Sequence, residues 1–163
     1  QGHRCARCRV IQPVLLPRTD YKRPESVLVN VYTRSGETLL LQRAGNPFWQ
    51  SVTGSLNWDE RDPADAARRE LLEETGIAAS DGWRDWKQSR RFMILPEYRY
   101  RYGPGVIDNE EHVFSLELPG RCEVRLDPQE HVQSQWEKIE TAAKSLWSWT
   151  NRAALSQLAE ELV

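Results

Sequence analysis

The sequence predicts an α+β domain in which helices pack against a mixed β-sheet. Three observations lead to this class: strand-like segments lie on both sides of a well-capped helix, two of these segments are joined by a hairpin turn, and a second helical pattern follows the last strand. Strands connected both by hairpin turns and through helices are typical of sheets with mixed strand directions. The 163 residues suffice for one domain, which would bury roughly 68–70% of the surface of the unfolded chain.

The predicted strands are rich in β-branched and apolar residues and are bounded by turn residues. Ser35 and Gly36 provide the turn of the first hairpin. Pro47 interrupts the chain before a short strand, and Pro96 ends a longer segment whose strand pattern is broken by charged residues. The expected strands cover residues 25–33, 38–42, 49–53, 83–95, 111–118 and 131–136, and residues 98–105 are expected to form a loop.

The first helix is predicted from Pro63 to Thr75 by the residues at its ends. Asp62 is a good N-cap, and proline suits the first helical turn. Gly76 is the residue expected in the left-handed conformation just past the end. A second helix is expected at 151–162, where apolar residues recur at helical spacing.

Three glutamates, Glu70, Glu73 and Glu74, share one face of the first predicted helix, because residues three and four positions apart lie one above the other. Like charges with this spacing repel by roughly 0.2–0.5 kcal/mol per pair on an isolated helix. Arg69 can offset part of the charge, and a hard cation such as Mg²⁺ can offset more while sharing its remaining positions with substrate phosphates. A glutamate-rich face is usually solvated surface, so the surrounding residues decide between the two interpretations.

The surrounding residues resemble the Nudix box. Its fixed positions are occupied here by Gly54, Glu60, Arg69, Glu70, Leu71, Glu73, Glu74, Gly76 and Ile77. Eight residues separate Glu60 from Arg69, where the family has seven, and we place the extra residue near Arg61 because inside the helix it would rotate one half by about 100° against the other. The role of Glu60 is left open. The resemblance implies a Nudix-type α/β/α sandwich with a mixed β-sheet and hydrolysis of a nucleoside diphosphate linked to another group.

Other segments resemble the bacterial dihydroneopterin triphosphate pyrophosphohydrolases, also described as dATP pyrophosphohydrolases. The similar segments are 21–24, 48–55, 101–106, 130–131 and 149–152, within a resemblance that covers residues 21–158. It implies release of pyrophosphate from dihydroneopterin triphosphate in folate biosynthesis, with dATP as a second substrate. The implied cofactor is Mg²⁺, with Mn²⁺ as a substitute.

The same resemblance implies roles for individual residues. Metal ligands are expected at Glu70, Glu74 and Glu130, and catalytic residues at Arg69, Glu70, Glu73 and Glu74. Glu73 is the first choice for the general base, and Glu130 is the alternative. Substrate contacts are expected at Lys22, Arg43, Thr53, Phe92, Met93, Ile94, Leu95, His131 and Ser148. The residue types suit a triphosphate on a flat ring, since cations bind phosphate and an aromatic side chain packs on a ring.

Several of these residues also have a purely structural interpretation. Lys22 and Arg43 are then solvated cations, Thr53 an ordinary strand residue, His131 a structural histidine and Ser148 a cap or turn residue before the last helix. Four tryptophans, Trp83, Trp86, Trp147 and Trp149, are expected in the core or at an interface rather than at a substrate.

Composition narrows the classes of partner. A formal net charge of −2 argues against nonspecific binding of nucleic acid polymers or acidic membranes, and no apolar run approaches a membrane span. We therefore expect a cytoplasmic protein, a monomer or a homodimer, with a small-molecule triphosphate as its partner. Residues 1–20 are expected to be an N-terminal extension, with 1–3 resembling the remnant of a cleaved tag, and 21–163 the domain.

Two alternatives keep the Nudix fold, and a third rests on cysteines near the N-terminus. One is a Nudix hydrolase of another nucleoside triphosphate or nucleoside diphosphate derivative, and the other is a non-catalytic nucleotide-binding module on the same fold. Cys5 and Cys8, near His3, form half of a zinc-site pattern that would suit a nucleic-acid-binding zinc ribbon. A closed zinc site needs four ligands, and no second pair is evident in the sequence.

Overall fold

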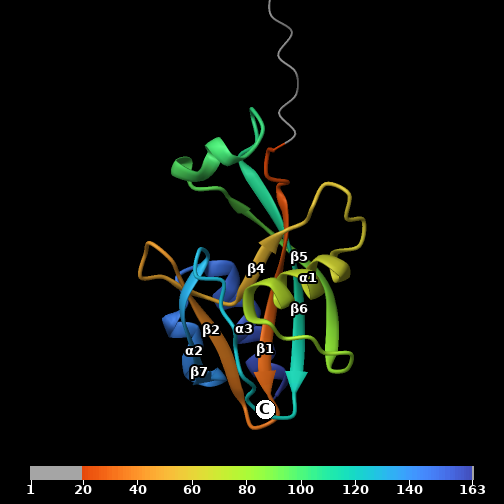
Figure 1. Cartoon of the computed structure of the whole chain (residues 1–163), viewed down its shortest axis with the longest axis vertical. Helices are drawn as coiled ribbons and strands as arrows, with labels where there is room; N and C mark the ends of the chain where they lie inside the picture. The colour runs from red at the N-terminus through yellow and green to blue at the C-terminus, as the bar shows by residue number, and fades with distance from the viewer. Residues whose placement is uncertain (1–19, 163) are drawn as a thin grey trace, which may run out of the picture.

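The computed structural model describes residues 20–162 and contains a mixed sheet with helices on both faces (Figure 1). In chain order the elements are β1 (Glu25–Thr33), β2 (Glu37–Arg43), β3 (Trp49–Gln50), β4 (Val52–Ser55), α1 (Pro63–Thr75), β5 (Trp83–Met93), the 3₁₀ helix η1 (Pro96–Arg101), β6 (Asp108–Leu118), β7 (His131–Lys138), α2 (Ile139–Ala142), the 3₁₀ helix η2 (Ala143–Ser145) and α3 (Trp149–Glu161). The prediction of an α+β fold with a mixed sheet is confirmed. Cys5 and Cys8, with the zinc site suggested for them, lie outside the described residues.

Strand β1 is the centre of the sheet. It runs parallel to β6 along its whole length and antiparallel to β4 over residues 26–29, while its far end meets β2 at the pair Tyr32 and Thr38. Strands β3 and β7 extend the sheet beyond β2, and β5 extends it beyond β6. Strand β4 therefore lies next to the central strand, and the loop that precedes α1 follows it directly.

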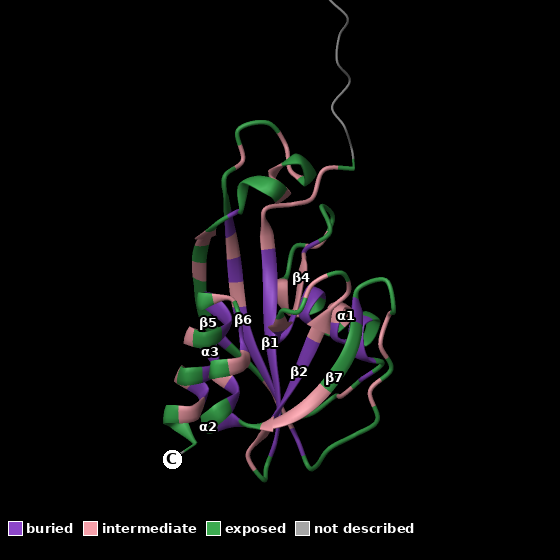
Figure 2. Cartoon of the chain, turned by 90° about the vertical axis from the view of Figure 1, so that its left-hand side faces the viewer, coloured by how far each residue is buried: buried purple, intermediate pink, exposed green. Residues whose placement is uncertain are grey.

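Side chains of β1 alternate between two cores, as expected for a strand buried on both faces. Val27 and Val29 pack in the core that includes Leu71 of α1. Leu28 packs in the second core with Leu155 of α3. In Figure 2, where β1 is buried over most of its length, α2 and α3 lie on one side of this strand and α1 on the other. The layers are those of an α/β/α sandwich.

The predicted limits of α1 are confirmed at both ends. The side chain of Asp62 accepts a hydrogen bond of 2.9 Å from the backbone N–H of Ala64, and Gly76 has a φ of 73°. The helix is continuous from Pro63 to Thr75, so the extra residue of the motif lies in the loop before it.

Other element limits differ from the sequence prediction for local reasons. The strand expected at 49–53 is divided at Ser51, whose backbone N–H donates to the side chain of Asn151 rather than to a neighbouring strand. The loop expected at 98–105 begins as the helix η1, in which the N–H of Tyr98 donates to the carbonyl of Leu95. Strand β6 begins at Asp108, three residues before the expected start. The short helices α2 and η2 carry too few residues to show a periodic pattern.

Within residues 20–162, no helix has the length and apolar character needed to cross a membrane.

Candidate active site

Two carboxylates of α1, those of Glu70 and Glu74, are withdrawn from solvent. Glu74 is buried, and the side chain of Glu70 is 12% exposed. Burial raises the pKa of Glu70 from its ordinary value of 4.5 to about 7, and it raises the pKa of Glu74 well above the same value. The negative charge of Glu70 adds to the shift at Glu74. The two carboxyls therefore ionise together only at a cost, unless a cation lies between them.

Strand β4 brings its backbone against both carboxylates. The backbone of Thr53 hydrogen-bonds to the carboxylate of Glu74, whereas Oε2 of Glu74 is buried without a hydrogen-bond partner among the described residues. A Cβ at Gly54 would lie 2.0 Å from the carboxyl carbon of Glu70, so a glycine is needed for this approach. Clustered carboxylate oxygens, one of them unpartnered, suit a hard divalent cation. The residues present thus fit the metal that the motif predicts.

Arg69 holds the acidic cluster together from one side. Its guanidinium donates to Glu60 at 2.7 Å, to Glu70 at 3.0 Å and to Glu73 at 3.1 Å. It also donates to the carbonyl of Ser55 at 2.9 Å, which ties the helix to the end of β4. The hydrogen bond from Arg69 lowers the pKa of Glu60. Glu60, whose role the extra residue left open, thus forms an ion pair with Arg69 at the edge of the cluster.

The two candidate bases, Glu73 and Glu130, are both exposed. Glu73 lies one turn from Arg69 on α1 and accepts its hydrogen bond. Glu130 precedes β7, and its carbonyl accepts a hydrogen bond of 2.8 Å from the N–H of Ala44. The charge of Glu130 contributes to the raised pKa values of both Glu70 and Glu74. The loop before β7 thus places the carboxylate of Glu130 close enough to Glu70 and Glu74 for its charge to act on them.

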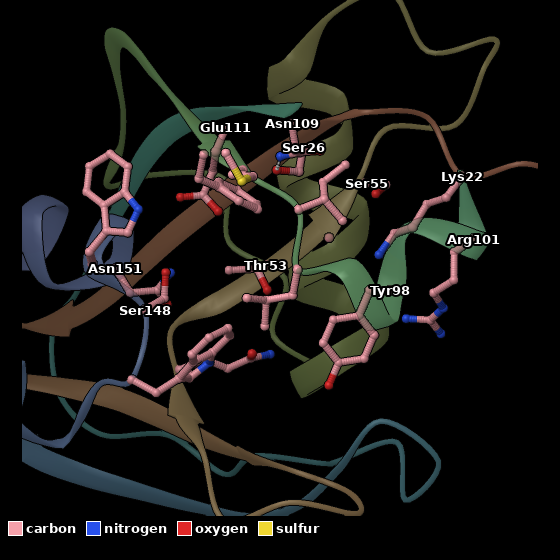
Figure 3. Close-up of a pocket in the computed structure, with 18 of the residues that line it drawn as sticks. Lys22, Ser26, Thr53, Ser55, Tyr98, Arg101, Asn109, Glu111, Ser148 and Asn151 are labelled. Carbon is pink, nitrogen blue, oxygen red and sulfur yellow. Dashed lines mark hydrogen bonds between the residues drawn. The ribbon is translucent and has the colours of Figure 1, made fainter. Parts of the chain in front are cut away.

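A cavity of about 290 Å³ lies on the other side of β4 (Figure 3). Eight of the nine predicted substrate contacts line it: Lys22, Arg43, Thr53, Phe92, Met93, Ile94, Leu95 and Ser148. Thr53 and Gly54 belong both to this lining and to the backbone that meets the carboxylates. The predicted contacts therefore come together in one cavity next to the predicted metal ligands, and their contact with a substrate stays a prediction.

One end of the cavity is cationic. Lys22, Arg43 and Arg101 line it, and burial lowers the pKa of Lys22, with the charges of Arg101 and Arg43 acting in the same direction. The charge of Glu70 acts on Lys22 with the opposite sign. Such an end attracts a polyanion that also reaches the carboxylate cluster.

His131, the ninth predicted contact, is not part of the lining. It is buried, and its Nε2 lies 2.9 Å from the amide nitrogen of Gln50, which does line the cavity. Because that amide donates, the ring nitrogen is unprotonated, in agreement with the lowered pKa that burial gives His131. His131 therefore lies behind the lining and contacts it through Gln50, and its contact with a substrate stays a prediction.

The expectation that Trp147 and Trp149 lie in the core is wrong, whereas a position at an interface stays a prediction. Both line the cavity, and they are 36% and 51% exposed. The ring of Trp147 stacks on Phe48 at a centroid distance of 5.0 Å. Trp147 lies directly before α3 and Trp149 at its start. No local sequence pattern there distinguishes a tryptophan of the core from one that lines a cavity. Trp86, by contrast, is buried in the core as expected.

Sequence reasoning also missed polar residues of the lining. Asn109 and Glu111 lie in β6, and Asn151 lies in α3. The available signal was the alternation of β6, since residues two apart on a strand share a face. The predicted strand began at residue 111 and therefore did not include Asn109.

A second group of possible metal-binding side chains consists of Glu25, Glu110 and His112, whose ligand atoms lie within 4.8 Å of one another. His112 contacts Glu25 at 2.7 Å, and Arg23 donates to the same carboxylate at 2.6 Å. Burial acts to raise the pKa of Glu25, but the hydrogen bonds from His112 and Arg23 outweigh it and lower this pKa. The group is thus accounted for by its own ion pairs.

The fold and this site are those of a Nudix hydrolase. The chain belongs to the Nudix family, because the family profile described as the NUDIX domain matches residues 22–158. Nudix hydrolases depend on a divalent metal, in agreement with the fit of Glu70 and Glu74 to a cation. The family predicted from the box is confirmed.

Curated relatives with 36–40% identity span almost the same region. The chain is 40% identical over 142 residues to "Dihydroneopterin triphosphate diphosphatase" of Escherichia coli, covering 84% of this chain and 93% of that protein. It is 36% identical to the protein of the same name from Haemophilus influenzae, covering 84% of this chain and 88% of that protein. A solved structure, the E. coli dihydroneopterin triphosphate pyrophosphohydrolase, matches with a TM-score of 0.80 at 38% identity over 86% of this chain and 98% of the other.

Changing Gly54 to Ala is expected to lower metal-dependent turnover by roughly tenfold or more while leaving the fold intact. The added methyl would meet the carboxylate of Glu70, which is the end of a flexible side chain and can move without the helix. Calorimetric titration with Mn²⁺ should show weaker binding in the variant. The control is Gly120→Ala, at a site with no heavy atom within 4 Å of the new Cβ. Unchanged Mn²⁺ affinity in Gly54→Ala would contradict the prediction.

Proposed function

We propose that this chain is a pyrophosphohydrolase that converts dihydroneopterin triphosphate to the monophosphate and pyrophosphate, using Mg²⁺ and accepting dATP as a second substrate. The observation that carries the proposal is the position of β4, which has buried carboxylates on one side and a ring-sized cavity with a cationic end on the other. The names of the relatives from E. coli and H. influenzae support the choice of substrate. The proposed enzyme is cytoplasmic, acts on a small molecule and is a monomer or a homodimer.

The proposed metal ligands are Glu70, Glu74 and Glu130. A bound divalent ion would neutralise phosphate oxygens and lower the pKa of an attacking water. Lys22, Arg43 and Arg101 would hold the remaining phosphate charge, with each arginine offering two parallel donors and the lysine a point charge. Phe92 and the tryptophans of the lining would pack against the ring.

In this proposal, Arg69 and Glu60 hold the other carboxylates in place. Arg69 spans Glu60, Glu70 and Glu73, so it fixes the carboxylates of α1 relative to one another before a substrate arrives. Glu73 is the proposed general base because it is exposed and held by this arginine, and Glu130 is the alternative. Comparing the pH profiles of Glu73→Gln and Glu130→Gln separates them, since loss of the base removes the acidic limb of the profile.

A substrate panel tests the proposal. Pyrophosphate release from dihydroneopterin triphosphate and from the four deoxynucleoside triphosphates is measured with Mg²⁺ and with Mn²⁺. We expect kcat/KM to be highest for the pterin, with dATP hydrolysed more slowly. A higher kcat/KM for any nucleotide would favour the alternative of a Nudix hydrolase with another substrate. No metal-dependent turnover of any triphosphate would favour a non-catalytic binding module.

A further inference from the structure

Two buried polar side chains of β6 face the cavity from the same side of the strand. Asn109 and Glu111 are 1% and 4% exposed, and both belong to the cavity lining. They are two residues apart, so the alternation of the strand places them on one face. Figure 3 shows them together with Ser26 at one end of the cavity, whereas Lys22 and Arg101 lie at the other.

Each of these side chains has one atom bound by the protein and one acceptor left without a partner. The amide nitrogen of Asn109 donates to Ser26 at 2.8 Å, which turns its Oδ1 away from that bond. The hydroxyl of Thr150 hydrogen-bonds to the carboxylate of Glu111. Oδ1 of Asn109 and Oε1 of Glu111 are both buried without a hydrogen-bond partner among the described residues. Buried polar atoms are rarely left unpaired, so both acceptors point to a ligand that donates.

The surroundings suit a flat heterocycle. Phe92, which pairs with Asn109 across β5 and β6, supplies aromatic lining, and so does Trp149, which precedes Thr150. Ser148 and Asn151 supply further polar groups. The cationic end is the place for a phosphate chain, which leaves the end with Asn109 and Glu111 for the ring. A ring in this position turns one hydrogen-bonding edge toward two acceptors.

Two neighbouring acceptors match an edge with two N–H donors. A 2-amino-4-oxo ring, as in pterin and guanine, carries a ring N–H next to an exocyclic amino group, and a carboxylate can accept from both. The edge of adenine offers one amino group beside an unprotonated ring nitrogen. An ionised carboxylate repels that nitrogen and only a protonated carboxyl can donate to it, so dATP is the weaker substrate. An unpaired buried acceptor penalises the wrong ring strongly.

We propose that Glu111, assisted by Asn109, selects the ring of the substrate by accepting hydrogen bonds from the N–H donors of a 2-amino-4-oxo heterocycle. The inference rests on the proposed function for the placement of the phosphates, and it adds the residues that determine ring specificity. Burial also raises the pKa of Glu111 to about 7, and two N–H donors would stabilise its ionised form.

The test is Glu111→Gln, which keeps the size of the side chain and its contact with Thr150. Glutamine presents one donor and one acceptor, so it suits adenine better and a 2-amino-4-oxo ring worse. The readout is a ratio of two kcat/KM values. The numerator is the higher of the values for dihydroneopterin triphosphate and for dGTP, and the denominator is the value for dATP. This ratio is expected to exceed one in the unchanged protein and to fall roughly tenfold or more in the variant. A smaller fall, or a ratio below one in the unchanged protein, would overturn the proposal.

The ratio is internal to each protein, so a general loss of folded enzyme cancels from it. If Glu111→Gln does not fold, Glu111→Asp is tested in its place. Aspartate keeps the negative charge, but its carboxylate lies one methylene farther from the cavity. The same fall in the ratio is expected. The matched control is Glu110→Gln, a neighbouring carboxylate that accepts from Ser89 and does not line the cavity. Its ratio should stay within twofold of the unchanged protein.

The two proposals fail in different ways. The proposed function fails if a nucleotide is preferred to dihydroneopterin triphosphate in the unchanged protein. The inference about Glu111 still holds in that case if dGTP is preferred to dATP and the preference is lost in Glu111→Gln. It fails by itself if the pterin is preferred and Glu111→Gln affects all substrates equally.

Discussion

Changing Glu74 to Gln is expected to reduce metal-dependent turnover by roughly a hundredfold or more and to leave the fold intact. Glu74 is buried, and its Oε2 has no hydrogen-bond partner among the described residues. A neutral amide of the same size removes the negative charge and replaces one oxygen with a donor, so the affinity for a divalent cation falls. Pyrophosphate release at saturating Mg²⁺ is the measurement.

The thermal stability of the Glu74→Gln variant separates loss of a ligand from loss of structure. Burial raises the pKa of Glu74, so the charged form destabilises the metal-free protein near neutral pH and the neutral amide should not. With chelator present, the melting temperature of the variant is expected to equal or exceed that of the unchanged protein. The control is Asp65→Asn, in the first turn of the same helix, with turnover within twofold. Retention of more than a tenth of the activity by Glu74→Gln would exclude Glu74 as a metal ligand.

The fold could be predicted where the signal is local. The caps of α1 are adjacent in sequence to the helix that they limit, and both Asp62 and Gly76 act as expected. The strand pairs of the hairpin β1–β2 follow from a turn at Gly36 with a φ of 91°. The break at Ser51 was not predictable in this way, because its partner Asn151 is 100 residues away.

The candidate site also consists of a part with a local sequence signal and a part without one. The acidic cluster could be predicted because its members are spaced along one helix. The cavity is assembled from residues of β1 to β6, of η1 and of α3 with the segment before it, and no short pattern joins these. His131 and Gln50 illustrate the limit: they are 81 residues apart, and only their contact shows that the histidine lies behind the lining. Trp147 and Trp149 line the cavity, although their residue type alone favoured the core.

Stabilisation of the protein by Mg²⁺ is expected to depend on pH, since the metal competes with protons for the carboxylates of Glu70 and Glu74. Burial raises the pKa of Glu70 from 4.5 to about 7 and that of Glu74 in the same direction. Between the ordinary and the raised pKa, the folded state binds more protons than the unfolded state, so without metal the free energy of unfolding falls as pH rises from about 4.5 to 7. Added Mg²⁺ should offset this fall, because it binds only the ionised form.

Melting temperatures with and without Mg²⁺ at pH 5.5 and pH 8 measure this linkage. At a Mg²⁺ concentration of about 100 Kd, the metal stabilises the folded state by about 2.7 kcal/mol, which corresponds to an increase of roughly 5–10 °C for a domain of this size. The full increase is expected at pH 8 and less than about a third of it at pH 5.5, where the carboxyls of Glu70 and Glu74 hold their protons. In Glu70→Gln the increase at pH 8 should be lost, whereas Asp65→Asn should keep it. Equal increases at the two pH values would mean that Mg²⁺ binds carboxylates with ordinary pKa values, away from the buried face of α1.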